Sequence, residues 1–274
     1  MDGEAIGLDG KVIVVTGATQ GLGEAVARLA AQRGAAGIAV VGRDKAKGET
    51  AVAGLRDLGT DALFVAVELA EPDVAERVMS AVDEHFGVVH GVVNAAAETS
   101  RAGVWDVTTD HFDRMMAVNV RTPLFLTQAA ARVMQREGVG GSIVNIGSVS
   151  GYGGQVYLTP YAISKGALHT LTRNLAYSLM RDHIRVNLVN LGWMDTPAEH
   201  VVQRDVHGLG EDWLVRAEAE QPFGRLIKPE EAARTICYLL SDESGMMTGA
   251  SLDFDQSVVG AGDSPKPAAG EVWP

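Results

Sequence analysis

Short apolar runs alternate along the chain with longer segments of mixed polarity. The runs are nearly continuous in Val and Ile, and they occupy residues 12–16, 38–42, 62–67, 88–93, 142–147 and 185–190. Continuous apolar runs of this length are typical of strands that are buried on both faces of a parallel sheet. The pattern therefore predicts six strands of one parallel sheet.

The segments between these runs repeat apolar residues at helical spacing. They lie near residues 22–34, 44–58, 73–86, 111–137 and 160–182, and a further helix near 229–242 precedes a last strand near 250–254. Pro229 suits a helix start, because proline is tolerated in the first turn. Regular alternation of strand and helix predicts an α/β fold, a doubly wound parallel sheet of about seven strands with helices on both faces.

We find no internal repeat or linker, so residues 1–259 are interpreted as a single domain. Residues 260–274 are rich in Gly, Ala and Pro and are predicted to form a flexible tail. The single cysteine, Cys237, lies in an apolar helical pattern, which predicts a buried and inert thiol. Residues 1–11 lack the apolar core of a secretory signal, and no long apolar run follows, so we expect cytoplasmic residence without a membrane span.

The net charge of the chain argues against some classes of binding partner. The chain has 23 basic and 35 acidic residues, which gives a net charge of −12. An acidic chain is poorly suited to nucleic acid or to an anionic membrane surface. We therefore expect a small-molecule partner.

Glycines gather where the first strand gives way to the first helix. They stand at positions 17, 21 and 23. Glycine lets the backbone turn sharply and approach a pyrophosphate closely, and the helix N-terminus offers unpaired N–H groups. A strand before this turn and a helix after it are the context in which a dinucleotide site is credible.

Three further side chains suggest proton transfer at an alcohol or ketone oxygen. Tyr161 and Lys165 are four residues apart and therefore share one face of a predicted helix. A neighbouring cation would lower the tyrosine pKa from its ordinary value of about 10. Ser148 follows the fifth strand at its carboxyl end, where ligands bind in open α/β sheets, and could donate to a substrate oxygen.

Together these motifs resemble the short-chain dehydrogenase/reductase family. The matching features are Thr-Gly-x-x-x-Gly-x-Gly from Thr16, Tyr-x-x-x-Lys from Tyr161, and the serine at 148, and the likeness extends over about residues 8–256. The resemblance implies a single Rossmann-type domain that interconverts a secondary alcohol and a ketone with NAD(P). It implies Tyr161 as the acid/base, aided by Lys165 and Ser148, with Asn119 holding a water that links Lys165 to solvent.

The resemblance also implies which residues line the cofactor: Gly17, Thr19, Gln20, Gly21, Leu22, Gly23, Gly42, Arg43, Glu68, Leu69, Asn94, Ala95, Ala96, Tyr161, Lys165, Gly192, Met194 and Thr196. Some of these positions depart from the family pattern. The family usually has Asp where Glu68 stands, and Asn-Asn-Ala-Gly where this chain has Asn-Ala-Ala-Ala from Asn94.

The end of the second strand distinguishes the two nicotinamide cofactors. NAD-specific members of the family carry a carboxylate where Gly42 stands, and NADP-specific members carry a basic residue where Arg43 stands. A guanidinium matches a phosphate in bidentate fashion. We predict NADP(H) as the preferred cofactor, with NAD(H) possible.

The family's variable substrate loop corresponds to about residues 194–222. We expect substrate contacts from Ser148, Ser150, Gln155, Tyr161 and Trp193. This polar and aromatic set favours a small polar hydroxy compound or a sugar- or polyol-like substrate.

Two alternatives remain open, a 3-oxoacyl-(acyl-carrier) reductase and a non-catalytic cofactor-binding scaffold or redox sensor. The resemblance further implies a homotetramer, or a homodimer, formed through residues 111–137, 160–182 and 250–256.

Overall fold

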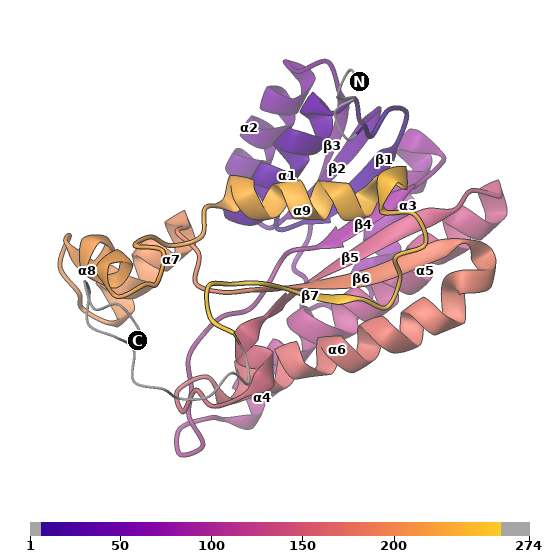
Figure 1. Ribbon diagram of the computed structural model, residues 1–274. Helices are drawn as coiled ribbons and strands as arrows, with labels where there is room; N and C mark the ends of the chain where they lie inside the picture. The colour runs from indigo at the N-terminus through magenta and orange to yellow at the C-terminus, as the bar shows by residue number, and fades with distance from the viewer. Residues whose placement is uncertain (1–6, 259–274) are drawn as a thin grey trace, which may run out of the picture.

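The computed structural model describes residues 7–258. Seven parallel strands form one sheet in the order β3-β2-β1-β4-β5-β6-β7 (Figure 1). Their bounds are β1 Val12–Thr16, β2 Gly37–Gly42, β3 Asp61–Ala66, β4 Gly91–Asn94, β5 Gly141–Ser148, β6 Ile184–Leu191 and β7 Ser251–Phe254. The predicted doubly wound sheet is confirmed.

Helices cover both faces of the sheet. They are α1 Gly21–Gln32, α2 Lys45–Arg56, α3 Val74–Phe86, α4 Thr109–Met116, α5 Thr122–Glu137, α6 Thr159–Leu179, α7 Pro197–Val201, α8 Trp213–Ala219 and α9 Pro229–Leu240. Residues of α1, α2 and α9 share one buried core with the sheet, and residues of α3, α5 and α6 share the other. In Figure 1, α9 crosses in front of the strands with α1 and α2 at the upper left, and α5 and α6 lie at the lower right.

The fourth strand begins later than its apolar run suggests. The run starts at residue 88, but β4 begins at Gly91. The amide of Val12 donates to Nδ1 of His90 at 3.0 Å, so a side chain satisfies the first N–H of β1. The ladder between β1 and β4 therefore starts with the pair Ile13 and Gly91.

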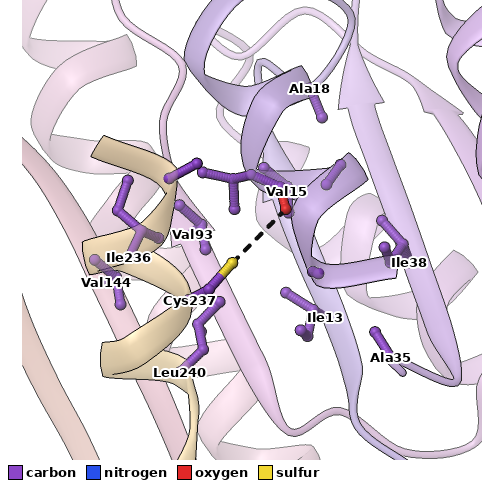
Figure 2. Packing of buried hydrophobic residues seen from close by; sticks show 14 of the residues in the cluster. Ile13, Val15, Ala18, Ala35, Ile38, Val93, Val144, Ile236, Cys237 and Leu240 are labelled. Carbon is purple, nitrogen blue, oxygen red and sulfur yellow. Dashed lines mark hydrogen bonds between the residues drawn. The ribbon is translucent and has the colours of Figure 1, made fainter. Parts of the chain in front are cut away.

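The single cysteine is part of the core beneath α9. Cys237 packs among Ile13, Val15, Val93 and Val144 (Figure 2), and it is fully buried. Burial raises the pKa of its thiol to about 12. This environment confirms the prediction of a buried thiol and keeps it protonated at neutral pH.

The helix expected over residues 111–137 is interrupted. Between α4 and α5 the backbone forms a π-helix, η1, over Ala117–Arg121. π-turns occur frequently at functional sites, and periodicity alone does not reveal them. Asn119 stands at the centre of η1.

The expected substrate loop is partly helical. It contains α7, a second π-helix η4 (Val202–Val206) and α8, which extend away from the sheet in Figure 1. The predicted tail, 260–274, lies outside the described residues. Among residues 7–258, no helix is long and apolar enough to cross a membrane.

Candidate active site

The glycine-rich turn accepts no larger side chains at its crowded points. A Cβ on Gly23 would lie 2.4 Å from the carbonyl oxygen of Gly17, and one on Gly17 would lie 2.9 Å from Cα of Ala96. Gly17 also has φ +70°, a conformation that side chains disfavour. On the opposite wall, a Cβ on Gly42 would lie 2.7 Å from Cγ2 of Thr19. These contacts bring three backbone segments together around one cavity.

The cavity has a volume of about 290 Å³ and contains most of the predicted cofactor positions. Its lining includes Gly17, Thr19, Gln20, Gly21, Leu22, Gly23, Gly42, Arg43, Glu68, Leu69, Ala95, Ala96 and Thr196. Helix α1 starts here, and the side chain of its N-cap residue, Gln20, makes no capping hydrogen bond. The first N–H groups of α1 are therefore available, as a pyrophosphate requires.

Five predicted cofactor residues lie outside the lining of this cavity: Asn94, Gly192, Met194 and the catalytic candidates Tyr161 and Lys165. Asn94 donates from Nδ2 to Oδ1 of Asn145 at 2.8 Å and so ties β4 to β5. Met194 forms a β-bridge with Ile227. At Gly192, a Cβ would lie 1.8 Å from Oδ1 of Asp255, so a larger residue there would have to displace this carboxylate.

A chain of charges crosses the far end of the cavity. Glu68 lies 3.5 Å from Nη1 of Arg43 and 3.4 Å from Nη2 of Arg114, whose Nε lies 3.1 Å from Glu98. Burial would raise the pKa of Glu68, but the Ala70 amide and the two arginines outweigh burial and lower it. The sequence did not single out Arg114 or Glu98, because neither belongs to a motif and only the fold brings them to Glu68.

The catalytic candidates meet at the carboxyl edge of β5. Ser148 ends this strand, and Tyr161 and Lys165 face it from the first turns of α6. Nζ of Lys165 lies 5.5 Å from the centroid of the Tyr161 ring and donates to the carbonyl oxygen of Ile146 at 2.7 Å. The structure thus places the predicted serine, tyrosine and lysine together.

Their pKa values correct one expectation. Burial lowers the pKa of Lys165 to about 8 and raises that of Tyr161 to about 12. A hydrogen bond with Ser148 and the charge of Arg101 lower the pKa of Tyr161, and the charge of Glu199 raises it. Lys165 is not among the groups that shift the pKa of Tyr161, and burial outweighs the two groups that lower it.

The side-chain amide of Asn119 is hydrogen-bonded to other protein groups. Its Nδ2 donates to the Glu98 carbonyl and to Oγ of Ser164, both at 2.9 Å, and its Oδ1 accepts from the Glu98 amide at 2.8 Å. The side chain joins the loop after β4 to α6. Its role in holding a water remains a prediction.

The expected substrate residues surround the same edge. Oγ of Ser150 donates to Oε1 of Gln155 at 2.7 Å, and the Ser150 amide donates to Oγ of Ser148 at 3.1 Å. Trp193 donates from Nε1 to Glu199 of α7 at 2.8 Å. Sequence reasoning placed Glu199 only in the variable loop and missed Arg101 altogether, since neither has a motif around it.

An all-parallel sheet in this order, with a glycine-walled cavity at the N-terminus of α1 and a Ser–Tyr–Lys set beside it, defines a Rossmann-type dinucleotide-dependent oxidoreductase. A family model described as "Enoyl-(Acyl carrier protein) reductase" matches residues 17–257. The chain belongs to the short-chain dehydrogenase/reductase family.

Individual relatives cover almost the whole chain. The cis-4-hydroxycyclohexanecarboxylate dehydrogenase of Sinomonas cyclohexanicum is 36% identical, over 89% of this chain and 95% of its own. L-rhamnose 1-dehydrogenase (NAD(P)(+)) of a Sphingomonas species is 34% identical, over 90% and 96%. The structure of L-sorbose reductase from Gluconobacter frateurii with NADPH and L-sorbose superposes with a TM-score of 0.87 at 27% identity, over 92% and 98%.

Proposed function

We propose that this protein is an NADP(H)-preferring dehydrogenase/reductase that interconverts a secondary alcohol and a ketone on a small polar, sugar- or polyol-like substrate. One observation carries the proposal: Ser148, Tyr161 and Lys165 lie together at the edge of the sheet, beside a cavity shaped for a dinucleotide. Relatives that act on a hydroxycyclohexane acid, rhamnose and sorbose support the substrate class.

The role that we propose for each side chain follows from its position. When bound, the nicotinamide would supply or accept a hydride at the carbinol carbon. Oγ of Ser148 would donate a hydrogen bond to the substrate oxygen and fix its position. The hydroxyl of Tyr161, protonated at neutral pH, would donate its proton to a ketone oxygen during reduction. The buried ammonium of Lys165 would hold the ribose hydroxyls and stabilise the phenolate that this transfer leaves.

The preference for NADP(H) rests on charge around the expected 2′-phosphate. Arg43 directly follows β2, and its side chain is 68% exposed, so its guanidinium can turn from Glu68 toward a ligand. Lys47 donates from Nζ to Oε1 of Gln20 at 2.8 Å, beside a hollow of about 590 Å³ between α1 and α2. Two cations at the rim of the site favour a phosphate over a bare ribose.

A reductase of 3-oxoacyl chains on an acyl carrier is the second candidate, favoured by the similarity to the structure of a 3-oxoacyl-(acyl-carrier-protein) reductase from Agrobacterium tumefaciens with NADP bound (TM-score 0.81, 25% identity). The net charge of −12 opposes docking of an acidic carrier.

The test is an absorbance assay at about 340 nm, the reduced nicotinamide band, over alcohols, polyols, sugars, ketones and an acyl-carrier thioester, each with NAD(H) and NADP(H). We expect turnover of polar hydroxy compounds or their ketones, faster with NADP(H). Turnover of the thioester alone would replace the proposal with the second candidate. A flat trace with every compound would indicate a non-catalytic cofactor-binding protein.

A further inference from the structure

The loop that carries Arg101 is bonded to the start of α6, the helix that carries Tyr161, although the two segments are far apart in sequence. The next residue, Ala102, forms a parallel bridge with Leu158, and its carbonyl accepts from the amide of Thr159 at 3.0 Å. Thr159 begins α6, which carries Tyr161 in its first turn. The loop after β4 is therefore fastened to the start of the catalytic helix.

The guanidinium of Arg101 is held in place but incompletely bonded. Its side chain is 20% exposed; Nη1 donates to the carbonyl of Thr99 at 3.1 Å, and Nη2 lies 3.7 Å from Oε1 of Glu199. Its Nε is fully buried and has no hydrogen-bond partner among the described residues. A buried donor without an acceptor is costly, and such a group calls for an explanation.

Glu199 supplies the opposite charge from the substrate loop. Its side chain is 18% exposed, and its Oε1 accepts from Nε1 of Trp193 at 2.8 Å and from Nε2 of Gln203 at 2.5 Å. All side-chain hydrogen bonds of Glu199 among residues 7–258 involve Oε1, so Oε2 can accept a further one. The bridge between Ala102 and Leu158 holds Arg101 at the start of α6, and the charges of Arg101 and Glu199 shift the pKa of Tyr161 in opposite directions, so both lie within electrostatic reach of its hydroxyl.

We propose that Arg101 and Glu199 bind a second oxygen of the substrate, so that the substrate is a ketone with a hydroxyl group near the reacting carbonyl, or the corresponding diol. Nη2 of Arg101, which makes no hydrogen bond among the described residues and is not fully buried, donates to this hydroxyl, and Oε2 of Glu199 accepts from it. A neutral hydroxyl uses both groups at once because it is donor and acceptor. A carboxylate would satisfy Arg101 but would face the carboxylate of Glu199, which disfavours a hydroxy acid.

This inference rests on the proposed function and names the substrate feature that the same site selects. The experiment compares kcat/KM, with saturating NADPH, for 2-hydroxycyclohexanone, cyclohexanone and 3-oxocyclohexanecarboxylate. The variants are Arg101→Met, which keeps the aliphatic stem, and Glu199→Gln, which keeps an acceptor for Trp193. Arg77→Met is the matched control, since Arg77 is 46% exposed on α3, outside the substrate loop, and pairs only with Glu71 and Asp73 among the described residues.

We expect the wild-type protein to prefer the hydroxyketone over cyclohexanone by about tenfold or more. Arg101→Met should reduce this ratio on the order of 10- to 100-fold, because it removes a hydrogen bond from a charged donor. Glu199→Gln should reduce it in the same direction, which keeps the test decisive if Arg101→Met fails to fold. Arg77→Met should leave the ratio and both rates unchanged.

The inference is overturned if the wild-type protein shows no preference, if it prefers the carboxylate, or if both site variants slow the two neutral ketones equally. Absence of turnover with all three ketones, and throughout the wider assay, would instead overturn the proposed function itself.

Discussion

The chemistry of single residues here is set by burial. Lys165 is 3% exposed, and the phenol of Tyr161 is desolvated enough that its pKa rises to about 12. A tyrosine that stays protonated serves as an acid, which suits ketone reduction at neutral pH. Oxidation of an alcohol needs the phenolate, so it depends on the positive charge that a bound oxidised nicotinamide would add.

Replacing Tyr161 with Phe removes the proposed proton donor and keeps the ring. We expect turnover to fall by about 100-fold or more, the usual contribution of general acid–base catalysis. The dissociation constant for NADPH, measured by fluorescence titration, should change by less than about threefold, because the ring still fills its site. A variant with a near-normal rate would remove Tyr161 from the mechanism.

Lys165 should make stability depend on pH. Its pKa of about 8 in the folded protein lies below its ordinary value of 10.5, so the unfolded chain binds more protons between these pH values. The free energy of unfolding therefore rises with pH across this window, and the full cost of the buried charge, about 3 kcal/mol, applies below pH 8.

Lys165→Met should accordingly raise the free energy of unfolding at pH 7. We expect a gain on the order of 2 kcal/mol, less than the full cost because the hydrogen bond to Ile146 is also lost. Denaturant titrations at pH 7 and pH 10.5 measure this, and the gain should shrink at the higher pH. A variant that is less stable than wild type at pH 7 would show that the ammonium is better solvated than its burial suggests.

At the scale of elements, the turns that lead from strands into helices hold the residues that we expect to select the cofactor. The turn from β2 into α2 is capped by Asp44, which accepts from the Lys47 amide at 3.1 Å. Asp44 therefore caps the helix, and Arg43 is left exposed at the rim of the cofactor cavity. Its pairing with Glu68 holds the guanidinium near the place where a phosphate would bind.

Arg43→Gln should separate the two cofactors. We expect the dissociation constant for NADPH to rise about 10- to 100-fold, through loss of a charged, bidentate contact, and that for NADH to change by less than about threefold. Isothermal titration with both cofactors measures this, and Arg77→Gln serves as the exposed-arginine control. An equal loss for NADH, or tighter binding of NADH by the wild-type protein, would contradict the preference.

The periodicity of apolar residues did not predict the π-turn between α4 and α5. The pattern over residues 111–137 predicts one helix, yet a π-turn interrupts it at Ala117–Arg121 and aims Asn119 at Glu98 and Ser164. A π-turn has about one more residue than an α-helical turn. The spacing of apolar residues therefore looks nearly the same before and after it. Hydrogen bonds from distant segments decide that the π-turn forms.

For the molecule as a whole, the strand order gathers the site. The carboxyl ends of β1, β4, β5 and β6 lie next to one another, so loops far apart in sequence surround one edge.

Helices α5 and α6 expose large apolar side chains: Phe125 is 43% exposed and Tyr177 is 78% exposed. Exposed aromatic residues on the helices expected to join subunits favour self-association.

We therefore expect a homotetramer. Light scattering after size-exclusion chromatography should give a mass of about four times 28.9 kDa. Tyr177→Glu should shift the mass toward smaller species, because it places a charge in a buried apolar contact. A monomeric wild-type protein would contradict the expectation, and an unchanged mass in the variant would place the interface elsewhere.

The sequence by itself determined the parallel sheet, the helices on both faces, the glycine-rich turn and the Tyr161–Lys165 pair. These features are local in origin, since apolar periodicity and short motifs are written in neighbouring residues. The tertiary structure alone decided the pKa values of Tyr161 and Lys165, which depend on burial by distant segments. It alone also brought Arg101 to Glu199, across 98 positions of sequence (199 − 101), because the loop after β4 and the loop after β6 meet only once the strands lie in order.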